Sequence, residues 1–546
     1  MLEILTARSG QPIARIRGTH LHSPYDPEKE ARRFVRQSIK QSNPSTILLL
    51  GAGLGYLYRE VTRSFPTAGV VVVFYHQALW KSFASALPPG SYWHPGESAT
   101  VLQFLRSRIH ELEAEGLAVV EWPPSAGIFP EVSLRANQAL HQLYREIRGT
   151  LVTTAALGRR WLRNSLANFL GIDEVFPPAA AEPGKGPTVI AASGPSLAEG
   201  IDFLAAYRES IELWALPSSL NFLLHRDLIP DTVVLTDPSY YAFSHLQCAQ
   251  DHHLHLTMPL SAARGSWRIR ARVSLVNQET PVERVLLEQA GVMAPTVPAA
   301  GTVAATALLL AQGLQKGPVV FTGLDFCYRD IVSHVRPNNF ENWLALKSNR
   351  LGSLHHQLFA LAAEQTAPAG EGGSRGTLAL NTYAGWFREA GNAKGGRRIY
   401  RLHPSEIELP GIDDIGETEL ERLIVRGKRS GKSRGKRASR EQGLLPLKPY
   451  PSRERRTEIV SAVLNGWIER MGALVAAIGR TASLEPLMSD SESLSLLYLC
   501  NAAEITEARR ILRLQGQEAA LRKTMALLEK HRLYLQGLYR VITGSQ

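Results

Sequence analysis

The distribution of apolar residues predicts a first domain of alternating strands and helices over residues 1–150. Three short apolar runs, Ile47–Leu50, Val70–Tyr75 and Leu117–Val120, have the length of buried strands, and helical spacing separates the first two. The first run leads directly into a glycine-rich turn that begins at Gly51. The order of strand, glycine turn, helix and strand predicts a Rossmann-like accessory domain.

A second series of apolar runs predicts a larger α/β domain over residues 186–415. Residues 151–185 precede it as a helical connector, which ends in a cluster of Pro, Ala and Gly that neither continues a helix nor joins a sheet. Because helical patterns separate several of the runs, we expect a doubly wound, mostly parallel sheet with helices on both faces. The strand candidates are Thr188–Ala192, Ile211–Leu216, Thr232–Thr236, Leu254–Met258, Arg272–Val276 and Pro318–Thr322.

The pattern changes after residue 415. Residues 416–450 hold a short charged helix, a basic run and a proline-containing segment, and they predict a flexible linker because the basic run cannot bury apolar area. Residues 451–546 return to helical spacing and predict a small helical bundle. The apolar stripe of the last helix consists of Leu521, Met525, Leu528, Leu535, Leu538 and Ile542.

The composition is that of a multidomain globular protein. The chain of 546 residues is too long for one core, and its 44% apolar and 20% charged residues are ordinary proportions. The sequence predicts a cytoplasmic protein without a membrane span, since it has neither a long apolar stretch nor a signal-peptide pattern. Cys248, Cys327 and Cys500 are far apart, which favours reduced thiols over disulfides or a metal site.

The net charge of +11 is concentrated in one segment. Arg426–Arg440 holds eight Lys or Arg residues and no acid, and the rest of the chain is close to neutral. A noncatalytic scaffold or nucleic-acid-binding protein is therefore one hypothesis. Basic runs are usually solvated, and no aromatic-rich strand surface accompanies this one, so nucleic acid is not the favoured partner. The run is also suited to an acidic acceptor or partner protein.

The turn after the first central strand is the strongest candidate for chemistry. Ser193-Gly194-Pro195-Ser196 leads into a predicted helix, whose free N–H groups and dipole would bind an anion such as phosphate. Ser196 and Glu199 also have the spacing of a capping box, which would satisfy the helix end without a ligand. The two interpretations are compatible.

Later residues would complete a site at the same edge of the sheet. Gly301 and Thr302 precede the apolar helix Val303–Leu314, which Thr302 can cap while backbone donors point outward. Asp237 and Asp325 follow strand candidates, at the edge where open α/β sheets bind ligands. Both are also ordinary turn residues, so a purely structural role is the alternative.

Histidines suggest a general base and, less strongly, a metal ligand. His334 follows the edge closely, and its ordinary pKa near 6.5 suits a base at neutral pH, although loop histidines are commonly inert. His252, His253 and His255 lie together at a turn, but no second cluster stands at metal-ligand spacing. The sequence therefore predicts no metal site.

The glycine turn of the first domain carries a weaker signal. Gly51, Gly53 and Gly55 have a cofactor-like spacing, but the second strand ends without the carboxylate that usually holds a ribose. A structural or accessory role is the favoured interpretation.

Together, these motifs resemble the motility-associated factor glycosyltransferases of flagellin. The resemblance lies in Ser193–Leu197, Ala215–Ser219, Ile229–Pro238, Gly301–Thr302, Gly323–Asp325, Asn381–Trp386 and Ile407–Gly411. Those enzymes share their central, MptE-like domain with archaeal-type 6-hydroxymethylpterin diphosphokinases, and that domain is similar to bacterial sialyltransferases. The first and last domains look like the same family more loosely.

The resemblance implies a CMP-activated nonulosonic acid of the pseudaminic, legionaminic or sialic type as donor. It implies a Ser or Thr hydroxyl of flagellin as acceptor, with inversion and without an obligatory metal or cofactor. Gly194 and Ser196 would meet the phosphate and ribose, and His334 would be the base. The other implied site residues are Asp237 and Asp325 at the edge, and Ser193, Pro195, Ser218, Ser219, Gly301, Thr302, Gly323 and Tyr328 around the nucleotide.

Pyrophosphoryl transfer from ATP to a hydroxymethyl pterin is the alternative activity of such a domain. It would need Mg²⁺ held by carboxylates, which would make Asp237 and Asp325 ligands. The extra domains favour sugar transfer, because a small-molecule kinase does not need them. The sequence leaves open which sugar is moved and whether the protein forms a homo-oligomer. The enzymatic hypothesis requires Gly194 and Gly301 to lie at one edge of the sheet.

Overall fold

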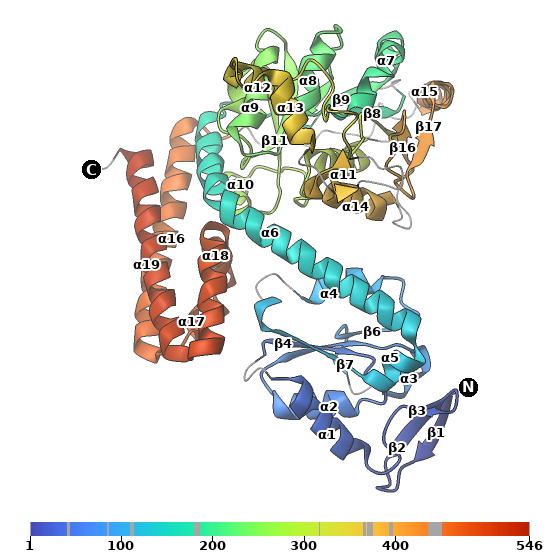
Figure 1. Cartoon of the computed structure of the whole chain (residues 1–546). Helices are drawn as coiled ribbons and strands as arrows, with labels where there is room; N and C mark the ends of the chain where they lie inside the picture. The colour runs from blue at the N-terminus through green and yellow to red at the C-terminus, as the bar shows by residue number, and fades with distance from the viewer. Residues whose placement is uncertain are drawn as a thin grey trace. The chain divides into compact units, whose positions relative to one another are not determined.

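The computed structural model is a mixed α/β protein with a helical carboxyl-terminal region, which confirms the predicted fold class (Figure 1). It divides into two compact units. Unit 1 comprises Met1–Gly158 with Glu469–Tyr534, and unit 2 comprises Arg159–Ile468 with Leu535–Gln546. The structure describes residues 2–40, 44–83, 87–109, 114–178, 186–315, 317–363, 367–368, 375–391, 397–434 and 450–544.

A four-stranded parallel sheet of order β6-β5-β4-β7 forms the centre of unit 1. The three predicted runs form β4 (Thr46–Leu50), β5 (Gly69–Val73) and β7 (Leu117–Glu121), and β6 (Tyr92–Trp93) is an edge strand. Every residue of β4 is buried, as expected for a central parallel strand. The helices of this part are α1 (Pro27–Ser38), α2 (Tyr56–Ser64), α3 (Gln77–Phe83), α4 (Val101–Arg108) and α5 (Pro123–Ile128).

A small antiparallel sheet precedes these elements. It consists of β1 (Leu2–Thr6), β2 (Pro12–Ile16) and β3 (Thr19–His20), none of which was predicted as a strand from the sequence. The chain then places His22 in the glycine turn, where its Nε2 accepts the Leu54 N–H at 3.0 Å. Gly53 has φ +61°, and a Cβ at that position would collide with the His22 ring. A side chain of the protein therefore fills this turn.

Eight parallel strands form the sheet of unit 2, in the order β12-β11-β10-β9-β8-β13-β16-β17. The predicted runs correspond to β8 (Thr188–Ala191), β9 (Glu212–Ala215), β10 (Thr232–Val234), β11 (Leu254–Pro259), β12 (Ala271–Val276) and β13 (Val319–Thr322). β16 (Ile399–Leu402) and β17 (Asp413–Ile415) extend the sheet beyond the prediction. The strand order reverses between β8 and β13, and such a reversal opens a crevice at the carboxyl ends of the strands.

Helices connect the strands of unit 2, and α11 (Val303–Leu314) lies on β8, β10 and β13. Its Ala305, Ala307 and Ala311 are fully buried, because small side chains allow the helix to approach the sheet closely. The others are α7 (Ile201–Ala206), α8 (Pro217–Leu224), α9 (Tyr240–Leu246), α10 (Pro281–Ala290), α12 (Asn339–Lys347), α13 (Leu354–Ala363) and α14 (Leu378–Gly391). Strands β14 (Ala367–Pro368) and β15 (Arg375–Gly376) form a separate pair.

Helix α15 (Glu417–Arg434) begins where the sequence predicted a short charged helix and continues into the basic run that was predicted to be flexible. It buries Leu420, Leu423 and Ile424. The Tyr207 hydroxyl also donates a hydrogen bond to the Glu421 carboxylate at 2.6 Å. The prediction of a flexible basic run is wrong as far as Arg434, where α15 ends, and residues 435–449 lie outside the described part of the chain.

Long helices complete both units. Helix α6 (Pro130–Gly171) has 42 residues, and the division between the units falls within it. The predicted helical region forms α16 (Arg453–Thr481), α17 (Glu485–Ser489), α18 (Ser491–Gln515) and α19 (Gln517–Thr543). In unit 1, Gly158 of α6 lies directly against the Leu499 carbonyl of α18, and a Cβ there would overlap that oxygen.

Within the described residues, α16 is the one helix long and apolar enough to cross a membrane. A single helix of this kind is weak evidence, because the core helix of a soluble protein has the same properties. Its buried apolar residues recur every three or four positions, which is the pattern of packing within a protein. They are Ile459, Val460, Leu464, Trp467, Met471, Leu474 and Ile478.

Candidate functional site

Asp325 occupies the turn that the sequence suggested for phosphate. Its Oδ2 accepts the Ser196 N–H at 2.8 Å, and the Gly194 N–H donates to the Gly323 carbonyl at 2.8 Å. A Cβ on Gly194 would lie 2.6 Å from that carbonyl and collide with the Asp325 carboxylate. The prediction that this turn holds free N–H groups is therefore wrong at Gly194 and Ser196. Pro195 has no N–H to offer.

The helix after this turn also differs from the prediction. A short 3-10 helix, Pro195–Ala198, follows Gly194, and α7 begins only at Ile201. The capping box does not form, since Gly194 and not Ser196 is the N-cap, and Glu199 forms an ion pair with Arg329. The turn is thus a closed structural unit at the end of β8.

Burial governs the charge of Asp325. Its side chain is only 3% exposed, and this desolvation raises its pKa, while hydrogen bonds from Ser196 and the charges of Arg329 and Arg401 oppose the rise. The backbone nearby is unusual, since Gly323 and Phe326 both have positive φ. Asp325 is therefore a buried carboxylate that holds the β8 and β13 turns together, rather than an exposed group at the edge.

The second glycine turn remains open. Gly301 has φ +74° with no atom within 4 Å of a Cβ position, and Thr302 is the N-cap of α11 without a side-chain hydrogen bond. Because α11 runs into the parallel strand β13, its first turn lies at the carboxyl edge of the sheet, as the Gly194 turn does. The first intrahelical bond goes from Thr306 to the Thr302 carbonyl, which leaves the preceding amides without an intrahelical acceptor.

His245 relates Asp237 and His334 as one electrostatic group, because the charges of both residues act on the pKa of His245. Asp237 is exposed at the end of β10 and accepts the Ser239 N–H at 2.6 Å. Burial raises the pKa of Tyr383 on α14, and the charge of Asp237 adds to this rise. Burial lowers the pKa of His245 on α9, the charge of His334 adds to this decrease, and the charge of Asp237 opposes it. His245 was missed in the sequence because no local motif identifies it, and Tyr383 was named only within the resembling segment Asn381–Trp386, without a role in the site.

Burial lowers the pKa of both histidines in this group. For His245 the pKa is lowered to about 4, with the His334 charge as the next cause. For His334 burial is again the largest cause, and the charge of Glu341 opposes it. Its Nδ1 lies 2.9 Å from the Ser333 hydroxyl, and the adjacent Val335 N–H donates to the Ser193 carbonyl at 2.8 Å. His334 is thus tied to the β8 turn as a half-buried imidazole.

The remaining residues that were predicted to contact the nucleotide of the sugar donor divide into two groups. Ser219 is fully buried, and its hydroxyl lies 2.7 Å from the Ala191 carbonyl and 2.9 Å from the Leu216 carbonyl, so it is structural. Ser218 at the start of α8 and Tyr328 after β13 are half-buried and lie at the same carboxyl edge. These two positions stay as predicted binding candidates.

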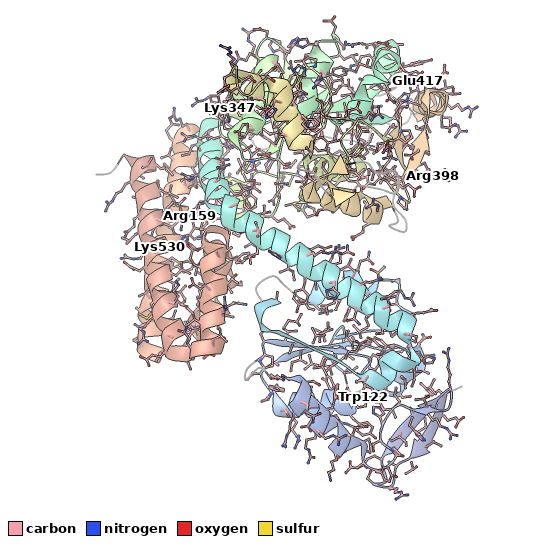
Figure 2. All side chains as sticks on the ribbon, in the orientation of Figure 1. Trp122, Arg159, Lys347, Arg398, Glu417 and Lys530 are labelled. Carbon is pink, nitrogen blue, oxygen red and sulfur yellow. The ribbon has the colours of Figure 1, made fainter. Side chains whose placement is uncertain are left out.

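A further polar group at this edge was not predicted. His403 follows β16, with its Nδ1 3.8 Å from Glu199 and its Nε2 3.6 Å from Glu417, which is labelled in Figure 2. A strand that contains Arg401 is hard to recognise from its sequence, because a buried arginine interrupts the apolar run. The Arg401 guanidinium donates two hydrogen bonds to the carboxylate of Asp414, its register partner on β17.

Two asparagines of α6 hold the loops beside Asp237. The Asn164 amide donates to the carbonyls of Pro238 and Ser261, at 3.0 and 3.3 Å. The Asn168 amide donates to Leu260 and Ala262, both at 2.9 Å, and its carbonyl oxygen accepts the Gly265 N–H. The ends of β10 and β11 are therefore fixed by buried side chains.

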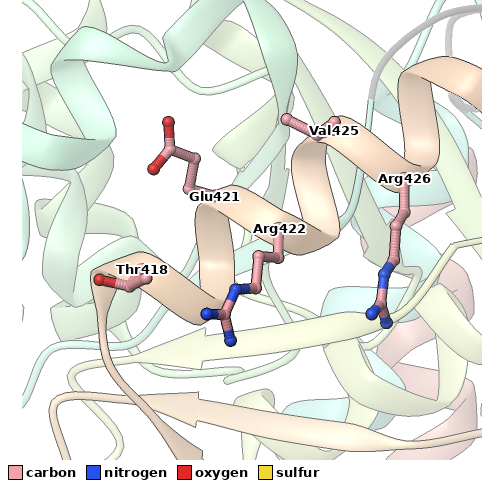
Figure 3. A pocket seen from close by; sticks show the side chains of 5 residues that line it. All are labelled: Thr418, Glu421, Arg422, Val425 and Arg426. Atoms are coloured by element: carbon pink, nitrogen blue, oxygen red, sulfur yellow. The ribbon is translucent and has the colours of Figure 1, made fainter.

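A cavity on α15 and the histidines suggested as metal ligands contribute nothing to the candidate site. A cavity of about 300 Å³ on α15 is lined by Thr418, Glu421, Arg422, Val425 and Arg426, as Figure 3 shows, and none of these is a predicted site residue. No group of three or more potential metal ligands occurs among the residues that the structure describes. The His255 ring instead contacts the Ser274 hydroxyl at 2.5 Å.

Comparison with known families and proteins gives three findings. Residues 163–330 match the family described as 6-hydroxymethylpterin diphosphokinase MptE-like. Two uncharacterized proteins of Treponema pallidum (strain Nichols) are each 25% identical to the chain. One aligns over 55% of this chain and 64% of its own length, and the other over 22% and 58%. The chain thus spans less than two thirds of either relative.

The third finding is a solved structure with the same fold. The Maf glycosyltransferase from Magnetospirillum magneticum AMB-1 superposes on 99% of this chain and 93% of its own, with a TM-score of 0.58 and 11% sequence identity. The family match and this shared fold confirm the resemblance that the sequence indicated. The central domain is MptE-like, and the fold of the chain is that of a Maf glycosyltransferase.

Proposed function

We propose that this chain, which carries an MptE-like domain within the fold of a Maf glycosyltransferase, transfers a sugar from a nucleotide-activated donor to a hydroxyl acceptor. The observation that carries the proposal is the extent of the shared fold, which covers 99% of the chain. The likeness therefore includes the parts on both sides of the MptE-like domain, which a small-molecule kinase would not need.

The leaving phosphate of the donor would bind at the start of α11. There Gly301 leaves open space, and the first amides of the helix have no intrahelical acceptor. Such donors, together with the helix dipole, stabilise the negative charge that develops on a departing phosphate without having to reorganise. We assign the phosphate to this turn rather than to Gly194, because the Asp325 carboxylate already accepts the Ser196 amide.

His334 would accept the proton of the attacking hydroxyl. Its lowered pKa keeps the imidazole neutral near pH 7, which a general base requires. The carboxylate of Glu341, whose charge acts to raise the pKa of His334, would favour the imidazolium that forms as the proton arrives. Attack by an acceptor held opposite the leaving phosphate would invert the configuration of the sugar.

The finer assignments follow from the resemblance. We propose a CMP-activated nonulosonic acid as donor, Ser or Thr of flagellin as acceptor, a cytoplasmic site of action and no obligatory metal. The sequence supports the last point, since no apolar strand ends in the Asp-x-Asp motif of many metal-dependent sugar transferases.

The MptE-like match favours a second candidate, the transfer of pyrophosphate from ATP to a hydroxymethyl pterin. In that reaction Asp237 and Asp325 would hold Mg²⁺, which usually keeps several of its water ligands. The burial of Asp325 and its bond to the Ser196 amide leave little room for such a hydrated ion. Sugar transfer is therefore preferred.

Calorimetric titration of the purified full chain separates these candidates. CMP, CDP, ATP and 6-hydroxymethylpterin would each be titrated into the protein with and without Mg²⁺. In a second experiment, flagellin would be incubated with the protein and CMP-activated sugars, and its mass would be measured by mass spectrometry. Preferential CMP binding without Mg²⁺ and a mass increase on flagellin are expected. Mg²⁺-dependent binding of ATP and pterin, with no sugar transfer, would establish the kinase instead.

A further inference from the structure

Three aromatic side chains form a surface beside Asp237, which we call the aromatic platform. Tyr240 and Tyr241 lie at the start of α9, and Trp343 lies on α12. The Trp343 ring meets Tyr240 edge-on at 6.0 Å between ring centroids and meets Tyr241 at 5.7 Å. Tyr240 and Tyr241 are 58% and 54% exposed, so their rings face solvent over much of their area.

The aromatic platform is continuous with the candidate site. Helix α9 follows Asp237 directly, with Ser239 as its N-cap. Helix α12 follows the His334 loop, and the Phe340 ring lies 6.2 Å from the His334 ring. The Asn339 amide donates to the Ser244 carbonyl at 2.5 Å and joins the two helices. The aromatic platform therefore adjoins the segments that carry Asp237 and His334.

Core packing does not explain these rings. None of the nine residues of α12 is buried, so this helix contributes no side chain to a core. Two neighbouring tyrosines with more than half of their surface in water lose the apolar burial that such side chains usually provide. Clustered exposed aromatics of this kind mark binding surfaces.

We propose that the aromatic platform receives the sugar ring of the nucleotide-activated donor. A pyranose has an apolar face of C–H groups that can lie on an aromatic ring, and a rim of hydroxyls that needs polar partners. Tyr and Trp provide both an apolar face and a polar group, while Asp237 and His334 supply acceptors beside them. The inference rests on the proposed glycosyltransferase function and adds the place where the transferred sugar binds.

The test compares CMP with CMP-activated N-acetylneuraminic, legionaminic and pseudaminic acids by calorimetry on the full chain. The wild-type protein should bind one CMP-sugar more tightly than CMP. The double variant Tyr240→Ala and Tyr241→Ala should lose about tenfold in affinity for that CMP-sugar and keep its affinity for CMP. Tyr240→Phe should retain most of the sugar affinity because the ring remains. Tyr25→Ala, which removes a tyrosine 60% exposed in unit 1, is the matched control.

Each other outcome contradicts a defined part of the inference. Equal binding of CMP and every CMP-sugar by the wild type, or unchanged CMP-sugar affinity in the double variant, overturns the platform and leaves the proposed function intact. Loss of flagellin binding with unchanged CMP-sugar affinity would assign the surface to the acceptor protein and also overturn the inference. If the wild type binds neither CMP nor any CMP-sugar, both the proposed function and the proposed sugar-binding role of the aromatic platform are wrong.

Discussion

The Asp325 carboxylate accepts the Ser196 N–H across the turns that follow β13 and β8, at 2.8 Å and almost without exposure to solvent. These two strands are neighbours at the point where the strand order reverses. The bond therefore fixes the centre of the carboxyl edge, on which the open α11 turn and the His334 loop also lie.

Removing this carboxylate should destabilise the protein. We expect Asp325→Ala to lower the free energy of unfolding by about 1–3 kcal/mol, because the buried Ser196 N–H loses its acceptor. Asp325→Asn keeps an acceptor oxygen and removes a buried charge, so it should cost less. Urea unfolding of both variants checks this, and equal losses would contradict it.

The pH dependence of Asp325 has a defined sign. Because burial raises its pKa, the folded protein binds this proton more tightly than the unfolded chain does. The resulting stability is complete below the ordinary pKa of 3.8 and is lost as the pH rises through the folded pKa. Asp325→Asn should therefore gain stability relative to the wild type as the pH rises through this range. A constant difference in unfolding free energy would contradict the assignment.

His334→Gln should abolish most of the transfer activity and leave CMP affinity unchanged. General bases typically contribute about 10²–10⁴-fold in rate. Since burial lowers the pKa of His334, wild-type kcat should fall only when the pH drops below 6.5, through the folded pKa. Steady-state kinetics across pH measures both effects. His253→Gln, at an exposed histidine of the same unit, is the control and should behave as wild type.

Asn168→Ala should destabilise unit 2, whereas Ser165→Ala on the same helix should not. Asn168 satisfies two carbonyls and one N–H, and each buried group left without a partner costs about 1–3 kcal/mol. The buried Ser165 hydroxyl has no hydrogen-bond partner among the described residues, so its removal is expected to be neutral or slightly stabilising. Thermal melts of the two variants test the contrast, and similar melting temperatures would refute it.

Unit 1 should lose stability in mild acid through His22. Burial, assisted by the charge of Arg59, lowers the pKa of His22 to about 4 from the ordinary 6.5. Because the folded protein binds this proton less tightly than the unfolded chain, the contribution of His22 to the free energy of unfolding is complete above pH 6.5. It is lost as the pH falls from 6.5 towards 4, and the total loss is about 3 kcal/mol. His22→Gln should remove this pH dependence, as hydrogen exchange of the β4 and β5 amides would show. An unchanged acid sensitivity in the variant would point to other groups.

Two glycines of α6 should respond in opposite directions to alanine. Gly158→Ala places a methyl group on the Leu499 carbonyl and should destabilise unit 1 by about 1–3 kcal/mol. Gly149→Ala meets no atom within 4 Å and should gain about 1 kcal/mol from helix propensity. Chemical denaturation of the two single variants decides, and a stable Gly158→Ala protein would contradict the close contact.

The sequence was informative where the apolar pattern alone determines an element. All six strand candidates of unit 2 and the three of unit 1 form strands, because buried parallel strands need continuous apolar runs. β16 was missed because its buried Arg401 interrupts the apolar run and forms its ion pair with Asp414, a residue on another strand. The β1–β3 sheet was missed because its strands are short and only partly buried.

The candidate site was predictable only in part. The positions of Asp237, His334, Gly301 and Thr302 at the carboxyl edge follow from strand order and helix direction, which a sequence pattern can suggest. The engagement of the Ser196 amide by Asp325 depends on a contact between residues 129 positions apart. The same limit applies to His245 and His403, since nothing local distinguishes them from surface histidines.

His22 and Asp325 change how Gly53 and Gly194 are interpreted, because each side chain lies against one of these glycines. In each unit a side chain of the protein itself stands against the turn, and at Gly53 or Gly194 a methyl group would strike it. Evolutionary retention of these two glycines would therefore record a folding constraint. A survey of relatives that counted such glycines as cofactor fingerprints would overestimate the number of nucleotide sites in this fold.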